Sequence, residues 1–221
     1  MLNYVEYGKE NKYDDDIFFQ KYSQMSRSQQ GLAGAGEWET LRKLLPDFKD
    51  KRVLDLGCGY GWHCIYAMEH GASSVVGVDI SHKMLEVAKE KTHFPQVEYK
   101  CCAIEDVEFP EESFDVILSS LAFHYVADYE ILVKKIYRIL KSGGKLVFTV
   151  EHPVFTAYGT QDWYYNEKGE ILHFPVDNYY YEGKRTAVFL GEKVTKFHRT
   201  LTTYLNTLLA TVYKGCLLYT S

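Results

Sequence analysis

Hydrophobic and polar positions along this chain follow two different patterns. Short runs rich in β-branched and aliphatic residues predict buried strands at residues 52–56, 74–79, 97–101, 114–119 and 145–150. Between them, apolar residues recur every three or four positions, which predicts helices at residues 62–70, 81–91 and 128–140. Gly71 is a helix stop signal, and Ser81 is a helix N-cap signal.

The alternation of strands and helices predicts the fold class. Strands separated by helical crossovers form βαβ units with a parallel sheet, and right-handed crossovers place helices on both faces. We therefore expect an α/β fold over residues 51–150, with a Rossmann-like, doubly wound, mostly parallel sheet. Helical spacing at residues 16–25 and 37–45 predicts an N-terminal helical cap over residues 1–50.

The alternation stops after residue 150. Residues 151–199 contain eleven aromatic residues between Phe155 and Phe197, a density that indicates a separate insert. The insert is interpreted either as an aromatic mini-core or as a lid over a substrate pocket. Residues 200–209 read as a helix, followed by a short tail, so that 200–221 form a C-terminal segment.

The composition of the chain limits the kinds of molecule that it is expected to bind. The formal net charge is −5, and the chain has no basic run, which disfavours a nucleic acid or an anionic membrane surface. We find no apolar stretch long enough to span a bilayer and no secretory signal in residues 1–6. Five cysteines without repeated spacing favour free thiols in the cytoplasm over a disulfide framework or a zinc site. A small-molecule partner and no metal are expected.

The densest chemical signal is a glycine-rich turn after the first strand. Gly57, Gly59 and Gly61 stand at alternate positions before a helix. Glycine tolerates positive φ and lets the backbone approach a ligand closely at a helix N-terminus. The dinucleotide fingerprint would require glycine or alanine at position 62, where this chain has Trp62.

A carboxylate at the end of the second strand is the next signal. Asp79 can accept hydrogen bonds from both hydroxyls of a ribose, or it can cap the following helix. Because NAD-binding folds use the same geometry, Asp79 alone does not distinguish between nucleotide cofactors.

Five features in order resemble the class I S-adenosylmethionine-dependent methyltransferases of the small-molecule, methyltransferase type 11-like kind. They are Asp55-x-Gly57-x-Gly59-x-Gly61, Asp79, the loop 102–115, the loop 119–126 and the turn Lys141-Ser142-Gly143-Gly144. The chain has Ala103 where the family often has an acid, so either Glu105 or Asp106 would lie near the adenine amine, beside Ile104.

This resemblance implies S-adenosyl-L-methionine as the cofactor. It implies cofactor contacts at Tyr22, Asp55, Gly57, Cys58, Gly59, Gly61, Asp79, Ile80, Met84, Ile104, Glu105, Ser119 and Leu121. Tyr22 is interpreted either as a hydrogen-bond donor to the methionine carboxylate or as a core tyrosine.

The resemblance also implies in-line methyl transfer, for which alignment of the acceptor lowers the barrier. His124 and His152 follow the fourth and fifth strands and are the candidate general bases, although each is equally readable as a structural histidine. Glu151 would orient His152 or bind a cationic substrate. Aromatic residues Trp163, Tyr164, Tyr165 and Tyr179–Tyr181 would stack on a flat acceptor.

Two other functions remain open on the sequence. One is a non-catalytic nucleotide-binding or regulatory module on the same fold. The other is an NAD-dependent oxidoreductase, which Trp62 opposes.

The C-terminal segment departs from the family pattern. The family usually adds two strands after the fifth, as an antiparallel hairpin, and residues 210–221 are too few for it. We therefore expect a missing hairpin, a truncated chain, an open edge on the fifth strand and poor soluble expression.

Overall fold

A parallel sheet forms the centre of the molecule. The computed structural model describes residues 9, 11–158 and 161–211, and the backbone of 217–220. The strands of the sheet are β1 (Arg52–Leu56), β2 (Ser74–Asp79), β3 (Val97–Cys101), β4 (Phe114–Ser120), β5 (Leu140–Val150) and β10 (Leu217–Thr220). Their order is β10-β5-β4-β1-β2-β3, and each neighbouring pair is parallel. The predicted Rossmann-like sheet is confirmed.

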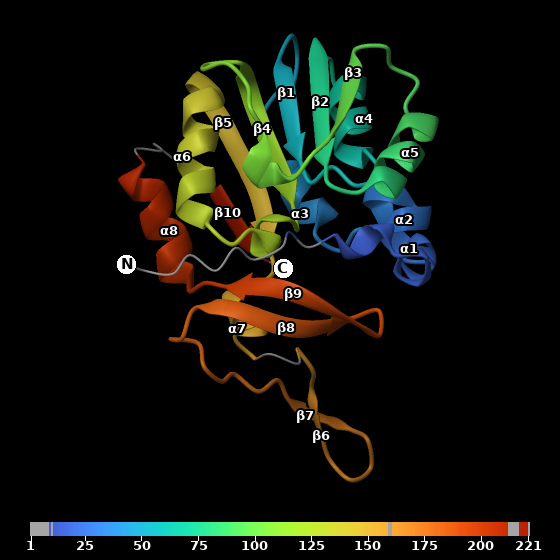
Figure 1. The fold of residues 1–221 in the computed structure, drawn as a ribbon, viewed down its shortest axis with the longest axis vertical. Helices are drawn as coiled ribbons and strands as arrows, with labels where there is room; N and C mark the ends of the chain where they lie inside the picture. The colour runs from blue at the N-terminus through green and yellow to red at the C-terminus, as the bar shows by residue number, and fades with distance from the viewer. Residues whose placement is uncertain (1–8, 10, 159–160, 212–216, 221) are drawn as a thin grey trace.

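Helices cover both faces of this sheet (Figure 1). One face carries α3 (Trp38–Leu44), α4 (Trp62–Glu69) and α5 (His82–Lys91), and the other carries α6 (Tyr129–Ile139) and α8 (Leu201–Ala210).

Successive side chains of each strand serve the two cores in turn, because strand side chains alternate between faces. Val53 and Val75 belong to the core of the first face. Leu54 and Val76 belong to the core of the second. This explains why the strands read as continuous apolar runs.

β5 starts earlier than the sequence predicts. Leu140 already pairs with Phe114, and the register shifts before Lys145 pairs with Val116. The predicted turn at residues 141–144 is therefore an irregularity within the strand, where Gly143 has a φ of 77°.

The N-terminal segment packs at the carboxyl edge of the sheet. It contains η1 (Lys12–Asp14), α1 (Asp16–Ser23), α2 (Ser26–Gln29) and η2 (Gly31–Gly34), followed by α3. Asp15 caps α1 by accepting a hydrogen bond from the amide of Phe18, whose ring is fully buried.

The insert consists of α7 (Pro153–Ala157) followed by two antiparallel hairpins. These are β6 (Tyr164–Tyr165) with β7 (Ile171–His173), and β8 (Gly183–Phe189) with β9 (Glu192–His198). The β8–β9 hairpin crosses below the carboxyl edge of the sheet (Figure 1), where Ala187 and Val194 pack on Phe18.

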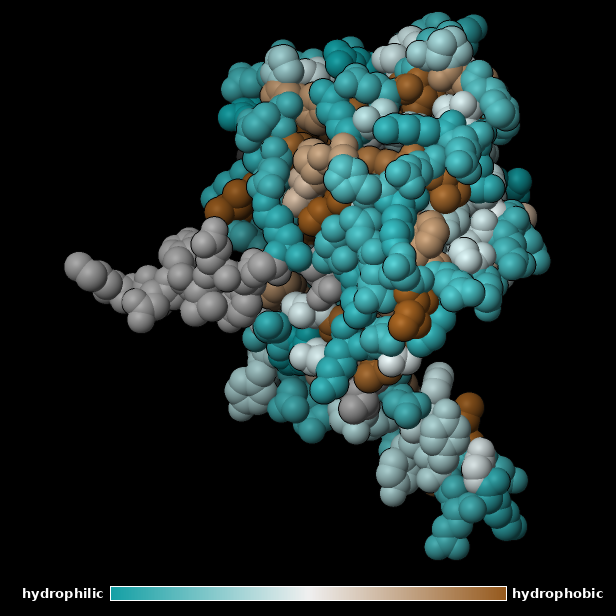
Figure 2. Space-filling view, turned by 45° about the vertical axis from the view of Figure 1, so that its right-hand side comes forward, coloured by the Kyte–Doolittle hydropathy of each residue, from teal (hydrophilic) through white to brown (hydrophobic). Residues whose placement is uncertain are grey.

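The β6–β7 hairpin projects away from the body of the molecule (Figure 2). Trp163, Tyr164 and Tyr165, in and beside this hairpin, are exposed, as are Tyr180 and Tyr181 farther along the insert. Aromatic packing in the segment is limited to small contacts, such as Phe174 with Phe155 and Trp163.

The edge of β5 is not open, which corrects the expectation from the sequence. Residues 217–220 form β10, which pairs with Val147–Val150 of β5 in parallel rather than as an antiparallel hairpin. β10 therefore replaces β5 as the edge strand of the sheet. Residues 1–6 and Cys216, on which the signal and thiol predictions also rest, lie outside the described residues.

Candidate active site

The glycine turn between β1 and α4 is built as the sequence predicts. Gly57, Gly59 and Gly61 all have positive φ, at 79°, 53° and 75°. The amides of Gly57 and Cys58 donate to the carbonyl of Val78, at 2.8 and 2.9 Å, which holds the turn against β2. An added Cβ on Gly59 would meet nothing within 4 Å. The turn therefore leaves a space beside Gly59 that a ligand can fill.

Asp79 is fixed beside this turn. Its Oδ2 accepts a hydrogen bond from the Gly59 amide at 2.9 Å, and its Oδ1 accepts one from the Ser81 amide at 2.9 Å. Burial raises the pKa of Asp79, and the two backbone donors oppose that effect. The carboxylate thus contacts the N-terminal end of α5, and it also lies beside the space at Gly59.

A cavity of about 410 Å³ opens at these residues. It lies where the strand order reverses between β1 and β4, the usual ligand position in open α/β sheets. Its size falls in the range of small-molecule pockets. The predicted site residues that line it are Tyr22, Gly57, Gly59, Asp79, Ile80, Met84, Ile104, Glu105, Leu121 and His124.

Asp55 and Ser119 do not line the cavity. Asp55 lies below the glycine turn, 1% exposed, where burial raises its pKa to about 7 and the Cys64 thiol donates to it at 3.5 Å. Ser119 points into the sheet and donates to the Leu56 carbonyl at 2.8 Å. Its neighbour Ser120 lines the cavity instead, because successive strand residues face opposite sides.

Cys58, Gly61 and His152 also lie outside the cavity. The Cys58 side chain is buried, and burial raises the pKa of its thiol. Gly61 faces Tyr99, whose hydroxyl would lie 2.1 Å from an added Cβ. His152 caps α7 by accepting from the Val154 amide at 3.1 Å, so it takes the structural role that the sequence left open.

The N-terminal cap supplies residues that sequence reasoning missed. Glu37 is 6% exposed, lines the cavity, forms an ion pair with Arg27 and accepts from the Ser120 hydroxyl at 3.2 Å. The Tyr13 hydroxyl lies 3.3 Å from that of Tyr125, and both residues line the cavity. No local pattern marks these positions, because they face the cavity only after the cap has packed on the sheet.

At one end of the cavity, His124 faces Glu151. His124 lies in η4 (Phe123–Tyr125) and is 2% exposed, and burial lowers its pKa to about 4. Its Nε2 lies 3.9 Å from Oε1 of Glu151, which follows β5. Burial alone would raise the pKa of Glu151, but His124 and Lys196 lower it. The pair is thus a neutral imidazole beside an ionised carboxylate at neutral pH.

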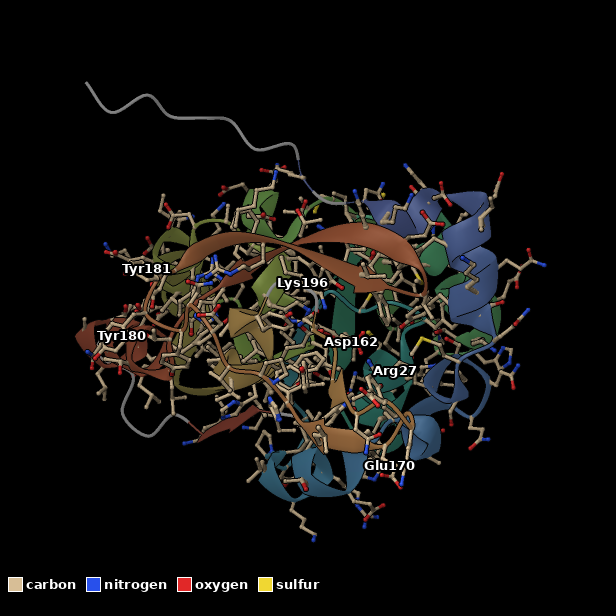
Figure 3. The ribbon with its side chains drawn as sticks, turned by 90° about the horizontal axis from the view of Figure 1, so that it is seen from below. Arg27, Asp162, Glu170, Tyr180, Tyr181 and Lys196 are labelled. Atoms are coloured by element: carbon tan, nitrogen blue, oxygen red, sulfur yellow. The ribbon has the colours of Figure 1, made fainter. Side chains whose placement is uncertain are left out.

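The aromatic residues expected to stack on the acceptor are elsewhere. Trp163, Tyr164, Tyr165 and Tyr179–Tyr181 do not line the cavity, whereas Phe189 of β8 does. In the view from below, Tyr180 and Tyr181 lie at the periphery of the molecule, while Lys196 lies nearer its middle (Figure 3).

A parallel α/β sheet with a glycine turn after β1, a carboxylate after β2 and one cavity across both is the arrangement of an enzyme that holds a nucleotide-like cofactor. Residues 54–148 match the sequence family described as "Methyltransferase domain". The fold also matches an S-adenosylmethionine-dependent methyltransferase from Listeria monocytogenes. That match has 57% identity and a TM-score of 0.77, and it covers 80% of this chain and 83% of the other.

Two further relatives match most of the chain. An S-adenosylmethionine-dependent methyltransferase from Mesorhizobium loti is 40% identical with a TM-score of 0.77, covering 83% of this chain and 84% of the other. An uncharacterised protein of Haemophilus influenzae is 36% identical over 89% of this chain and 80% of its own length. The chain belongs to the S-adenosylmethionine-dependent methyltransferases, an enzyme family with S-adenosyl-L-methionine as cofactor. Membership of this enzyme family replaces the two alternatives left open by the sequence, a non-catalytic regulatory module and an NAD-dependent oxidoreductase. Among the described residues, no helix is long and apolar enough to cross a membrane.

Proposed function

We propose that this enzyme transfers the methyl group of S-adenosylmethionine to a hydroxyl of a small-molecule acceptor, by in-line displacement at the His124–Glu151 end of the cavity. The observation that carries the proposal is that His124 and Glu151 line the same cavity as Gly59 and Asp79. Cofactor and acceptor would therefore share one enclosed space, as in-line transfer requires.

The cofactor end is assigned from the groups that suit each part of the molecule. Asp79 would accept from the ribose hydroxyls, and the open face of Gly59 would lie against the cofactor. Ile104 and Met84 would pack on the adenine, with Glu105 near its amine. Tyr22 would donate to the methionine carboxylate. When bound, the cofactor supplies an electrophilic methyl group on a positively charged sulfur.

The acceptor end suits a hydroxyl. The hydroxyl would lie beside His124 Nε2 and donate its single proton to that nitrogen, and Glu151 Oε1, 3.9 Å from Nε2, would stabilise the positive charge that the imidazole gains. The proton of the hydroxyl becomes strongly acidic as the oxygen is methylated, so the weakly basic His124 can accept it late in the step. Phe189 and Tyr125 provide apolar walls.

Glu151 is not expected to bind a cationic substrate. Lys196 Nζ already lies 2.5 Å from Glu151 Oε1 and satisfies its charge. A second cation would have to compete with a buried ammonium group, and this favours a neutral acceptor.

The proposal is tested in two stages. Calorimetric titration with S-adenosylmethionine, with NAD as control, should show cofactor binding that weakens about 10- to 100-fold in Asp79→Ala. Transfer of radiolabelled methyl to a panel of hydroxyl- and amine-bearing small molecules should then favour hydroxyls and fall sharply in His124→Asn. Transfer only to amines, or full activity in His124→Asn, would contradict the assignment of the acceptor end.

A further inference from the structure

Two buried cations, Lys196 and Arg199, lie near the end of β9. Lys196 is 2% exposed and Arg199 is 6% exposed, although lysine and arginine are rarely buried unless they are paired. Neither residue lines the cavity, so neither is placed to touch the cofactor or the acceptor. Their burial therefore requires an explanation from the groups that they contact.

Lys196 holds Glu151. Its Nζ donates to Glu151 Oε1 at 2.5 Å and to Gln161 Oε1 at 2.9 Å. Gln161 Nε2 in turn donates to Glu151 Oε2 at 2.9 Å. Both carboxylate oxygens are therefore held by donors from the insert, and the carboxylate has little freedom to rotate.

Arg199 holds the backbone that carries His124. Its Nη1 donates to the carbonyl of Phe123 at 3.4 Å, and its Nη2 donates to the carbonyls of Val126 and Ala127, the latter at 2.8 Å. These carbonyls flank His124 on both sides along the chain. A planar guanidinium with several fixed donors is suited to bind three carbonyls at once.

We propose that Lys196 and Arg199 are positioning residues, through which β9 sets the distance and orientation between His124 and Glu151. The insert then supplies two cations behind the acceptor end of the cavity, in addition to the wall that Phe189 provides. This inference rests on the proposed function in one respect, because it takes His124 and Glu151 as the pair that contacts the acceptor.

The charges around His124 give the proposal a measurable consequence. His124 faces Glu151 after β5, Lys196 and Arg199 from β9, and Tyr125 in its own turn. Tyr13 of η1 reaches this group through the hydroxyl of Tyr125. Lys196 and Arg199 lower the pKa of His124, while Glu151 raises it.

Removal of the Lys196 charge leaves Glu151 without its cation. The His124–Glu151 pair should then take up one proton at a pH about one to three units higher than in the wild type, because a carboxylate no longer neutralised attracts a proton to either partner.

The test is ring and carboxyl ¹³C NMR of the full chain between about pH 5 and 8, in the wild type, Lys196→Met and Lys193→Met. Lys193 is an exposed lysine on the same strand, so its variant controls for lost charge on β9. We expect His124 and Glu151 to titrate within this range only in Lys196→Met. The affinity of both variants for S-adenosylmethionine should stay within about threefold of the wild type. The Lys196→Arg variant should restore the wild-type behaviour in part.

Arg199 is tested by hydrogen exchange of the η4 amides. The amides of Tyr125 and Val126 donate to the carbonyls of Ala122 and Phe123, and their exchange should accelerate at least about tenfold in Arg199→Lys. Absence of titration in a folded Lys196→Met, together with unchanged exchange in Arg199→Lys, would overturn the proposal. Neither measurement needs an acceptor, so full methyl transfer by His124→Asn would refute the proposed function and leave the positioning result standing.

Discussion

Asp14 accepts a hydrogen bond of 2.6 Å from the hydroxyl of Ser81, the N-cap of α5. Asp14 also accepts from the amide of Lys83 at 3.2 Å. Ser81 lies two residues after Asp79, and its amide donates to the Asp79 carboxylate, which lines the cavity. The contact therefore links the N-terminal cap to the cavity through Ser81.

We expect Asp14→Ala to weaken S-adenosylmethionine binding by roughly fivefold, equivalent to about 1 kcal/mol, because the cap loses its hold on the α5 N-terminus. Calorimetry checks the change in affinity. Asp16→Ala is the matched control, because the Asp16 side chain is 95% exposed and its ion pair with Lys83 should contribute little. Equal affinities in the two variants would argue against this link.

Gly59→Ala should separate cofactor binding from folding. Its positive φ costs an alanine about 1–2 kcal/mol, but the added Cβ meets no protein atom within 4 Å. Gly143→Ala is matched in both respects and lies far from the cavity, within β5. Both variants should lose similar stability in urea unfolding. Only Gly59→Ala should lose affinity for S-adenosylmethionine, by about ten- to a hundredfold through a clash.

Asp55 should make stability fall as the pH rises. Burial raises its pKa in the folded protein to about 7, from 3.8 in the unfolded chain. Between about pH 4 and 7, the unfolded state therefore binds fewer protons than the folded state, and the free energy of unfolding decreases with pH by up to about 4 kcal/mol.

Asp55→Asn should remove this decrease in the free energy of unfolding with pH. The variant should be more stable than the wild type at pH 7.5, and it should gain no stability below the pKa that Asp55 has in the unfolded chain. Urea unfolding at several pH values measures the effect. An identical pH dependence in wild type and variant would show that Asp55 stays ionised. Because Asp55 does not line the cavity, the variant should also bind S-adenosylmethionine with little change.

Phe18 should connect the stability of the cap to that of the insert. Its fully buried ring packs with Ala187, Val194 and Phe189. Phe18→Ala should cost about 3–5 kcal/mol through the cavity it leaves, measured by chemical unfolding. Ile17→Ala, next in sequence but 60% exposed, should stay close to the wild type. Since alanine itself favours a helix, a similar loss in both variants would show that burial of the Phe18 ring is not what stabilises this contact.

The sequence by itself determined strands β1 to β4, the greater part of β5, the crossover helices between them, and several residues that line the cavity. These follow from local periodicity and from residues at strand ends, because the carboxyl ends of parallel strands meet at one edge. Gly57, Gly59, Asp79 and Ile104 line the cavity for that reason. Their chain order was enough to predict their place.

Only the tertiary structure decided which side chains meet at the His124–Glu151 end of the cavity. His124 and His152 are equivalent in sequence, each following a strand, but His124 lines the cavity whereas His152 caps α7. Ser120 rather than Ser119 lines the cavity because the strand register sets which face each side chain takes.

Glu37, Lys196 and Arg199 have no local signal at all. Each acquires its role by burial against a partner far away in the sequence. Glu37 contacts Ser120, 83 residues away, Lys196 contacts Glu151, 45 residues away, and Arg199 contacts Ala127, 72 residues away. Such contacts form when separately folded segments pack together, and the free energy of that packing is not encoded in the pattern of either segment alone.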